Sequence, residues 1–263
     1  MNAQTISMGA RQQVNSFLGA VVFLTRIPVG SLYHFQRTSL SRSVIYFPLV
    51  GALIGSTGGI ILAAAHAFFP ASIAVLLGMA TTTVVTGGLH EDGLADAADG
   101  LFGGRNAAHS LEIMKDSRLG TFGALALWFS LTAKFLSLSR LLAHGAGLTC
   151  AALIVANSLG RGACAALLYF YPCARVEESN ARPFGDSMTR RQLLLALAFS
   201  TALAFAVIGL AAAACTLASI AVTVLAGAYF KRKIGGVTGD CLGAANQLVE
   251  IASYLTLAAE IRP

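Results

Sequence analysis

Four carboxylates stand within the nine residues from position 91 to position 99: Glu91, Asp92, Asp96 and Asp99. The last three are spaced i, i+4 and i+7, so a helix would bring them onto one face and leave Glu91 off it. With a rise of ~1.5 Å per residue, Asp92 and Asp96 would be ~6 Å apart along the axis. Two carboxylates at ~6 Å repel by roughly 3 kcal/mol at an effective dielectric constant of ~20, and no Lys or Arg is interleaved. The cluster therefore predicts a bound cation.

The ligand atoms indicate which cation this is. Carboxylate oxygens without nearby thiolates or paired imidazoles favour Mg²⁺ or Mn²⁺ over zinc or copper. A ladder of ~10 Å is too long for one magnesium ion with bonds of ~2.1 Å, so we expect two ions bridged near Asp96, or one ion completed by another segment. A solvated acidic helix face is the plain alternative. Gly93 and Gly100 argue against it, because each costs a helix roughly 1 kcal/mol relative to alanine.

The composition is that of an integral membrane protein. Of 263 residues, 56% are hydrophobic and only 11% are charged, and the mean hydropathy is +0.72. A soluble domain of this length would be far less apolar. Residues 1–14 are polar and no small-residue cleavage site follows an apolar core, so we expect no cleavable signal peptide. The five cysteines are scattered without metal-ligand spacing, which indicates apolar packing.

Long apolar runs predict an all-α, polytopic membrane bundle of about seven transmembrane helices, since each run can cross ~30 Å of hydrocarbon. The expected spans are residues 44–65, 71–89, 121–143, 148–171, 192–210, 213–230 and 242–259. We expect a single membrane-embedded domain over residues 1–263, with residues 1–43 as a cytoplasmic or interfacial segment. Within it, residues 14–29 contain Arg26 and Pro28, which favours an interfacial helix over a span.

The connections between these spans alternate in charge. Residues 66–70, residues 144–147 and the turn near residue 211 hold no Lys or Arg. The other connections hold Arg37, Arg42, Arg105, Lys115, Arg118, Arg175, Arg182, Arg190, Arg191, Lys231, Arg232 and Lys233. The positive-inside rule places the basic set in the cytoplasm. We therefore expect a multi-pass protein of the bacterial cytoplasmic (inner) membrane whose site faces the cytoplasm. Nucleic-acid binding is not expected, because there is no separate soluble basic domain.

Two cations, Lys134 and Arg161, lie well inside apolar runs. Each costs roughly 3 kcal/mol or more there, so it should face the protein interior. Glu250 is the one acidic residue in the neighbouring spans. A structural ion pair and contacts with carbonyls or a substrate phosphate both remain open.

Five stretches together resemble the cobalamin synthase family, the adenosylcobinamide-GDP ribazoletransferases. They are GGLHEDGLADAADGLFGG at 87–104, EIMKDSRLGTFG at 112–123, FLTRIPV at 23–29, FPLVG at 47–51 and GGVTGDCLGA at 235–244. The resemblance implies a magnesium-dependent membrane transferase, in which Mn²⁺ could substitute. Such an enzyme joins adenosylcobinamide-GDP to α-ribazole or its 5'-phosphate, which releases GMP and gives adenosylcobalamin or its 5'-phosphate. A homo-oligomer, or a complex with other late cobalamin-pathway enzymes, is compatible with this function.

Attack of a ribose hydroxyl on the phosphate beside the cobinamide needs a neutralised diphosphate, in-line geometry and a base. For the metal we expect Glu91, Asp92, Asp96 and Asp99. Asp116 and Asp240 would complete the metal shell or act as the base. Phosphate oxygens would be held by Arg105, Lys115 and Arg118. The turn at 235–240, with Gly236, Thr238 and Gly239, would cradle a phosphate or a base, although a plain interhelical loop is the alternative.

Two other functions remain open. A CDP-alcohol phosphotransferase of phospholipid synthesis resembles the chain in DAADG at 96–100, but the Ala-Arg that follows in that family is missing and its later aspartate pair is reduced to Asp116. A divalent-cation transporter would use the carboxylates as ion ligands, but only Glu250 could continue a path through the membrane. GMP release would separate the two enzymes, and transport assays in vesicles would test the third reading.

Overall fold

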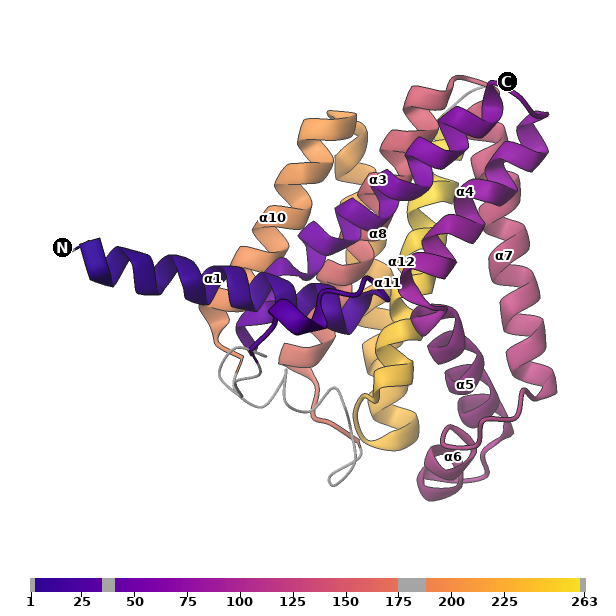
Figure 1. The fold of residues 1–263 in the computed structure, drawn as a ribbon. Coiled ribbons are helices and arrows are strands. Elements are labelled where there is room, and N and C mark those ends of the chain that lie inside the picture. The colour runs from indigo at the N-terminus through magenta and orange to yellow at the C-terminus, as the bar shows by residue number, and fades with distance from the viewer. Residues whose placement is uncertain (1–2, 35–40, 175–187, 261–263) are drawn as a thin grey trace.

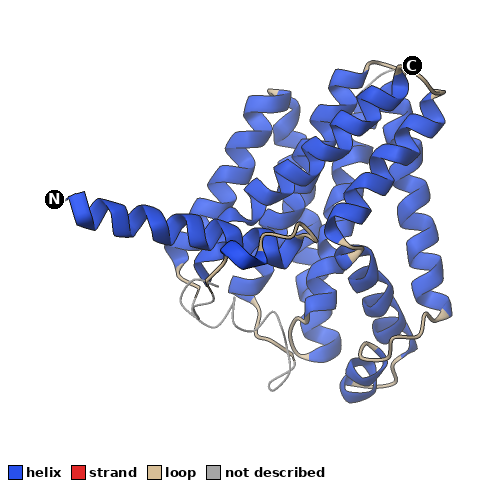
Figure 2. Ribbon diagram, viewed as in Figure 1, coloured by secondary structure: helices blue, strands red, loops and turns tan. Residues whose placement is uncertain are grey.

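The computed structural model describes residues 3–34, 41–174 and 188–260, with side chains from residue 11 onward. Within these ranges every named element is a helix, and short loops join the helices (Figure 2). The α-helices are α1 (Ala3–Leu24), α3 (Phe47–His66), α4 (Ala71–Thr86), α5 (Leu89–Gly103), α6 (Ala107–Ile113), α7 (Thr121–Leu142), α8 (Ala146–Phe170), α10 (Arg190–Ile208), α11 (Ala211–Ile234) and α12 (Gly239–Glu260). Two 3₁₀ turns, η1 (Gly30–Leu32) and η2 (Val44–Tyr46), lie between α1 and α3. The predicted all-α fold is confirmed.

Five segments of the described chain are each long and apolar enough to cross a membrane: Ser41–His66, Thr121–Leu142, Ala146–Phe170, Arg190–Ile208 and Ala211–Ile234. Of the seven predicted spans, the one at 71–89 is broken. Gly87 and Gly88 have φ angles of 67° and 71°, and α4 and α5 meet there at 85°. The two helices qualify only as one bent span. The segment at 242–259 forms α12, whose polar Asn246, Gln247 and Glu250 are buried inside the bundle and lower its hydropathy.

Among the described residues, the connections that hold Lys and Arg lie at one end of the bundle, and those that hold neither lie at the other end (Figure 1). Helix α6 lies at the lower end in this view, whereas the α3–α4 turn and the C-terminal end of α12 lie at the upper end. Helix α1 lies across the bundle axis and is not among the candidate spans. This position fits the predicted interfacial helix, although its bounds are earlier than 14–29. Of the predicted basic set, Arg37, Arg175 and Arg182 lie outside the described residues.

Helices α3 and α8 approach closely along a line of glycines. A Cβ atom on Gly51 would lie 2.3 Å from the backbone oxygen of Asn157, and one on Gly55 would lie 2.3 Å from that of Leu153. Gly59 continues the line against Cys150. Such small-xxx-small spacing lets membrane helices pack backbone to backbone. The sequence thus places α8 at the centre of the bundle, where it can carry buried polar groups.

Lys134 and Arg161 both pair with Glu250, which settles the alternative left open by the sequence. Lys134 Nζ lies 2.6 Å from Glu250 Oε2, and Arg161 Nη1 lies 2.5 Å from Oε1. Gln247 Oε1 also accepts a hydrogen bond from Lys134 at 2.6 Å. Arg161 Nη2 lies 3.4 Å from His90 Nδ1, at the start of α5. The network therefore joins α7, α8 and α12 and reaches the helix that bears the acidic cluster.

The charge asymmetry makes a topology prediction that can be checked directly. A reporter fused after Gly104 should read as cytoplasmic, and one inserted within residues 144–147 should read as external, because cytoplasmic connections carry the Lys and Arg excess. Alkaline phosphatase and green fluorescent protein fusions at both positions would measure this. The reverse pattern would move the acidic cluster to the external side, away from cytosolic nucleotides.

Candidate functional site

Helix α5 carries its carboxylates on one side and an apolar stripe on the other. Asp92 is exposed and Asp96 is half-buried, four residues further along the same face. The opposite face is formed by Leu94, Ala97, Ala98 and Leu101, which are buried at i, i+3, i+4 and i+7. The helix predicted for the acidic cluster is therefore confirmed. The chain bends at Gly87, so α5 and its acidic face do not continue along the axis of α4.

Asp99 is bound to the first turn of α7. Its Oδ2 accepts a hydrogen bond from Gly120 N at 2.7 Å, and its Oδ1 accepts one from Gly123 N at 2.9 Å. A Cβ on either glycine would come within 2.4 Å of the carboxylate. Helix N-termini carry unpaired amides and positive potential, so this placement stabilises both the charge and the helix. Asp99 therefore links α5 to the first turn of α7, and its assignment as a metal ligand stays a prediction.

Glu91 points toward α4, off the face of the other three acids as its spacing predicts. Its Oε1 accepts a hydrogen bond from Thr83 Oγ1 at 3.2 Å. Its Oε2 is buried and has no hydrogen-bond partner among the described residues. Glu91 also lines a small cavity with Lys134, Glu250 and Tyr254. Glu91 therefore lies on the side of α5 that faces the buried charge network.

Helices α5 and α12 cross where two glycines meet. A Cβ on Gly93 would lie 3.1 Å from the backbone oxygen of Asp240 and 3.2 Å from the Cα of Gly243. A Cβ on Gly243 would in turn lie 3.1 Å from the Cα of Gly93. Gly93 stands between Asp92 and Asp96 in the sequence. The close crossing thus explains the helical glycine and brings Asp240 to the acidic helix.

The turn at 235–240 joins the same region. Thr238 is fully buried and caps α12, since its Oγ1 accepts a hydrogen bond from Cys241 N at 3.2 Å. The same hydroxyl lies 3.2 Å from Asp240 Oδ2 and 4.0 Å from Met114 Sδ, next to Lys115. A Cβ on Gly236 would lie 2.2 Å from the backbone oxygen of Pro172, so Gly236 is needed for packing. Gly239 is exposed. Three connections, at 104–120, 171–174 and 235–240, therefore converge at one end of the bundle.

Asp116 and Arg118 form a tight local pair on the α6–α7 connection. Arg118 Nε lies 2.9 Å from Asp116 Oδ2, and the Arg118 backbone amide lies 3.1 Å from Oδ1. These hydrogen bonds from Arg118 hold the pKa of the Asp116 carboxyl below its usual value. The Lys115 and Arg118 side chains are exposed to solvent. Arg105 is also exposed, and its backbone amide donates a hydrogen bond to His109 Nδ1 at 3.3 Å.

Within residues 3–34, 41–174 and 188–260, no three His, Cys, Asp or Glu side chains are already placed to hold one metal ion. Of the four predicted metal ligands, Asp99 accepts hydrogen bonds from the start of α7 and Glu91 accepts one from α4. Asp92, Asp96 and Asp240 carry hard oxygen donors on two helices in close contact. That donor chemistry fits Mg²⁺ or Mn²⁺. The assignment of these residues to a metal stays a prediction.

Two residues that sequence reasoning did not assign lie beside this region. The Arg26 side chain packs on the break between α4 and α5, where a Cβ on Gly87 would lie 2.3 Å from Arg26 Nε. The Arg26 backbone amide also bonds to Val85 O at 2.8 Å. His90 contacts Arg161 of the buried network. The FLTRIPV stretch carried the signal for Arg26, but only the structure shows that it packs against the GG pair at 87–88.

Gly123→Ala should free Asp99 from α7, because the added methyl would overlap the carboxylate. The loss of a buried, charge-assisted hydrogen bond should lower the free energy of unfolding by about 1–3 kcal/mol. Hydrogen exchange should speed up in residues 119–125. Gly147→Ala, where an added Cβ meets nothing within 4 Å, is the matched control. Equal protection and equal thermal stability in the two variants would contradict the role given to Asp99.

The comparisons with known proteins agree on one family. The family model described as cobalamin-5-phosphate synthase matches residues 16–258. An adenosylcobinamide-GDP ribazoletransferase of Shewanella woodyi is 40% identical over 249 residues, which cover 94% of this chain and 96% of the relative. A protein of the same name from Ralstonia nicotianae is 40% identical over 243 residues, covering 92% and 93%. No solved structure matches the chain. Because model and relatives span nearly its whole length, the chain belongs to the cobalamin-5-phosphate synthase family.

Proposed function

We propose that this chain transfers the adenosylcobinamide-phosphate group of adenosylcobinamide-GDP to α-ribazole or α-ribazole 5'-phosphate, with release of GMP. The observation that carries the proposal is the Gly93–Gly243 crossing, which joins the acidic face of α5 to Asp240 and the basic α6–α7 connection at one end of the bundle. The names of the relatives support the choice of substrates. This end carries the basic connections, and the positive-inside rule therefore supports a site that faces the cytoplasm at the inner membrane.

The proposed site residues would have distinct roles in the reaction. Asp92, Asp96 and Asp240 would hold Mg²⁺, or Mn²⁺ in its place, which neutralises the diphosphate when bound. Lys115 and Arg118 would bind the phosphate oxygens of the nucleotide. Asp240, at the first turn of α12, would otherwise take the proton of the attacking ribose hydroxyl. The bond from phosphorus to the GMP oxygen breaks as the new phosphodiester forms.

Asp116 fits a positioning role better than that of a base. The Arg118 guanidinium keeps the pKa of Asp116 low, so its carboxyl stays ionised to a lower pH than an ordinary aspartate. Asp116 accepts hydrogen bonds from Arg118 Nε and Nη2 and so holds the guanidinium in place. Replacing Asp116 should therefore affect the reaction by releasing the Arg118 side chain.

Arg118→Ala should raise the apparent KM for adenosylcobinamide-GDP by about tenfold, because a charge-assisted contact to a ground-state diphosphate contributes to binding before chemistry. The value of kcat should change little. Steady-state kinetics with each substrate varied in turn would measure the two constants. Arg190→Ala, an exposed cation at the start of α10, is the matched control and should leave both unchanged. A fall in kcat alone would argue against a binding role for Arg118.

The function itself is tested with purified protein in detergent, given adenosylcobinamide-GDP, α-ribazole 5'-phosphate and Mg²⁺. Chromatography should show a corrinoid product and GMP in equal amounts. A parallel reaction with α-ribazole would establish which acceptor is preferred. Release of CMP from a CDP-alcohol, or uptake of Mg²⁺ into vesicles without any corrinoid product, would overturn the proposal in favour of the phospholipid enzyme or the transporter.

A further inference from the structure

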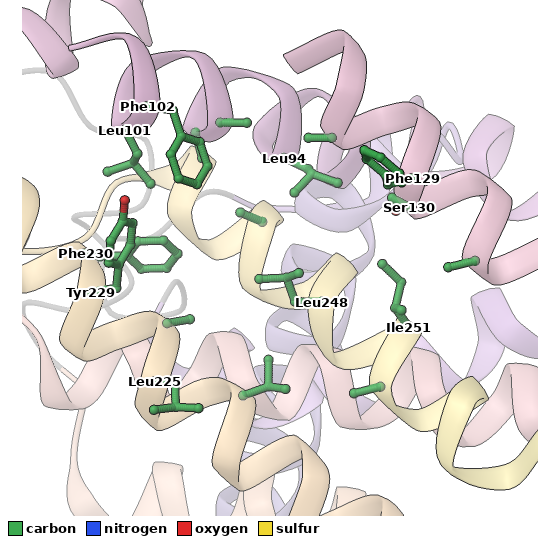
Figure 3. Close-up of a pocket in the computed structure, with 18 of the residues that line it drawn as sticks. Leu94, Leu101, Phe102, Phe129, Ser130, Leu225, Tyr229, Phe230, Leu248 and Ile251 are labelled. Carbon is green, nitrogen blue, oxygen red and sulfur yellow. The ribbon is translucent and has the colours of Figure 1, made fainter. Parts of the chain in front are cut away.

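An apolar groove of about 650 Å³ lies between α5, α7, α11 and α12 (Figure 3). Its lining is apolar except for the side chains of Ser130 and Tyr229. Phe102, Tyr229 and Phe230 gather at one end, and Phe129 lies toward the other. Between Ala244 and Leu255 of α12 the groove extends for ~16 Å at the helical rise per residue. This length is close to that of one leaflet of hydrocarbon, which is ~15 Å.

The groove opens toward the bilayer. Phe102 and Phe129 are each 61% exposed, and Leu225 is 70% exposed. Helices α7 and α11, which form two of its walls, are both candidate membrane spans with mostly unburied surfaces. An apolar groove between two candidate spans with exposed apolar side chains is expected to meet acyl chains rather than water.

One end of the groove adjoins a cluster of cations. Helix α11 ends in Lys231, Arg232 and Lys233. The guanidinium carbon of Arg232 lies 5.5 Å from the centroid of the Tyr229 ring, and Lys233 Nζ lies 5.8 Å from it. Tyr229 lines the groove and stands 6.3 Å from the Phe102 ring. An aromatic ring between a cationic cluster and an apolar groove is the arrangement expected at the membrane–water interface.

The groove is unsuited to the substrates. Its α5 wall is the apolar stripe that includes Leu94 and Leu101, opposite Asp92 and Asp96. A corrinoid carries amides and a nucleotide carries phosphates, which would be left without hydrogen-bond partners there. We propose that the groove binds an anionic phospholipid of the cytoplasmic leaflet, with one acyl chain in the groove and the headgroup phosphate at Arg232 and Lys233. The acyl chain would support the back of the helix that bears the acidic cluster.

The single tryptophan of the chain provides the test. The Trp128 ring centroid lies 4.8 Å from that of Phe129, which lines the groove. The protein is placed in phosphatidylcholine vesicles that contain a minor fraction of phosphatidylglycerol with brominated acyl chains, which quench tryptophan. The comparison is brominated phosphatidylcholine at the same fraction. Phosphatidylglycerol should be enriched at the site about fivefold for each cation engaged and should quench correspondingly more.

Two variants and one control decide the outcome. Arg232→Ala with Lys233→Ala should abolish the preference for phosphatidylglycerol. Arg190→Ala with Arg191→Ala, an exposed basic pair at the start of α10, should keep it. Ala252→Phe, which fills the groove from α12, should also abolish the preference. Equal quenching by both lipids, a preference that survives loss of Arg232 and Lys233, or displacement of the brominated lipid by α-ribazole would overturn the proposal.

Discussion

Asp96→Asn should lower the rate of GMP release by at least about a hundredfold, because changes even to groups that only support metal ligands cost about 10- to 100-fold. Asparagine keeps the size of the side chain and removes its charge. Asp96 lies one helical turn after Asp92 on the same face of α5, and Gly93 between them contacts Asp240, so Asp96 is central to the proposed metal site. The rate should be measured at saturating substrates over a range of Mg²⁺ concentrations.

The matched control for Asp96 is Asp99→Asn. Asp99 supports the first turn of α7, so its replacement should reduce thermal stability together with activity. Asp96→Asn should reduce activity with little change in stability. Near wild-type turnover for Asp96→Asn at limiting Mg²⁺ would remove this residue from the metal site.

Glu250→Gln should lower the free energy of unfolding by about 3–5 kcal/mol, the range found when one partner of a buried ion pair is removed. The change leaves Lys134 and Arg161 as two buried cations without a counter-charge, each under 10% exposed. Because Arg161 also contacts His90, α5 should be disturbed as well. Thermal unfolding in detergent, followed by circular dichroism, measures the loss.

Lys134→Met separates charge balance from packing. It removes one of the two cations and leaves Arg161 paired with Glu250, so it should destabilise the protein clearly less than Glu250→Gln. A result in which Lys134→Met is as damaging as Glu250→Gln would show that the contacts of Lys134, and not the buried charge, account for the effect.

The sequence was sufficient where a short-range pattern decides the outcome. Carboxylates at i, i+4 and i+7 share a face only if the segment is helical, and the segment at 89–103 is a helix. It was insufficient for Asp99, since its partners Gly120 and Gly123 are more than twenty residues away and are found only when α7 packs on α5. The glycines of GTFG belong to the sequence motif, but only the structure explains them: a side chain at either position would overlap the Asp99 carboxylate.

Hydropathy predicted seven spans, whereas the described residues contain five candidate spans and one bent helix pair. It read residues 71–89 as one span because it does not register the positive φ angles at Gly87 and Gly88 that bend the chain there. Conversely, α12 contains Gln247 and Glu250, which lower its hydropathy, and these side chains are buried against α7 and α8. In both segments, composition alone does not determine whether the helix is a straight, lipid-exposed span, because this depends on tertiary packing.

We infer that α5 and the first turn of α12 form one active site. A double-mutant cycle on GMP release, with Asp96→Asn, Asp240→Asn and the two combined, tests it most directly, because residues that act as a unit are not additive. If Asp96 and Asp240 act in one site, the double variant should lose about as much activity as the worse of the two single variants. Losses that multiply would contradict it, since they would place Asp96 and Asp240 in independent roles.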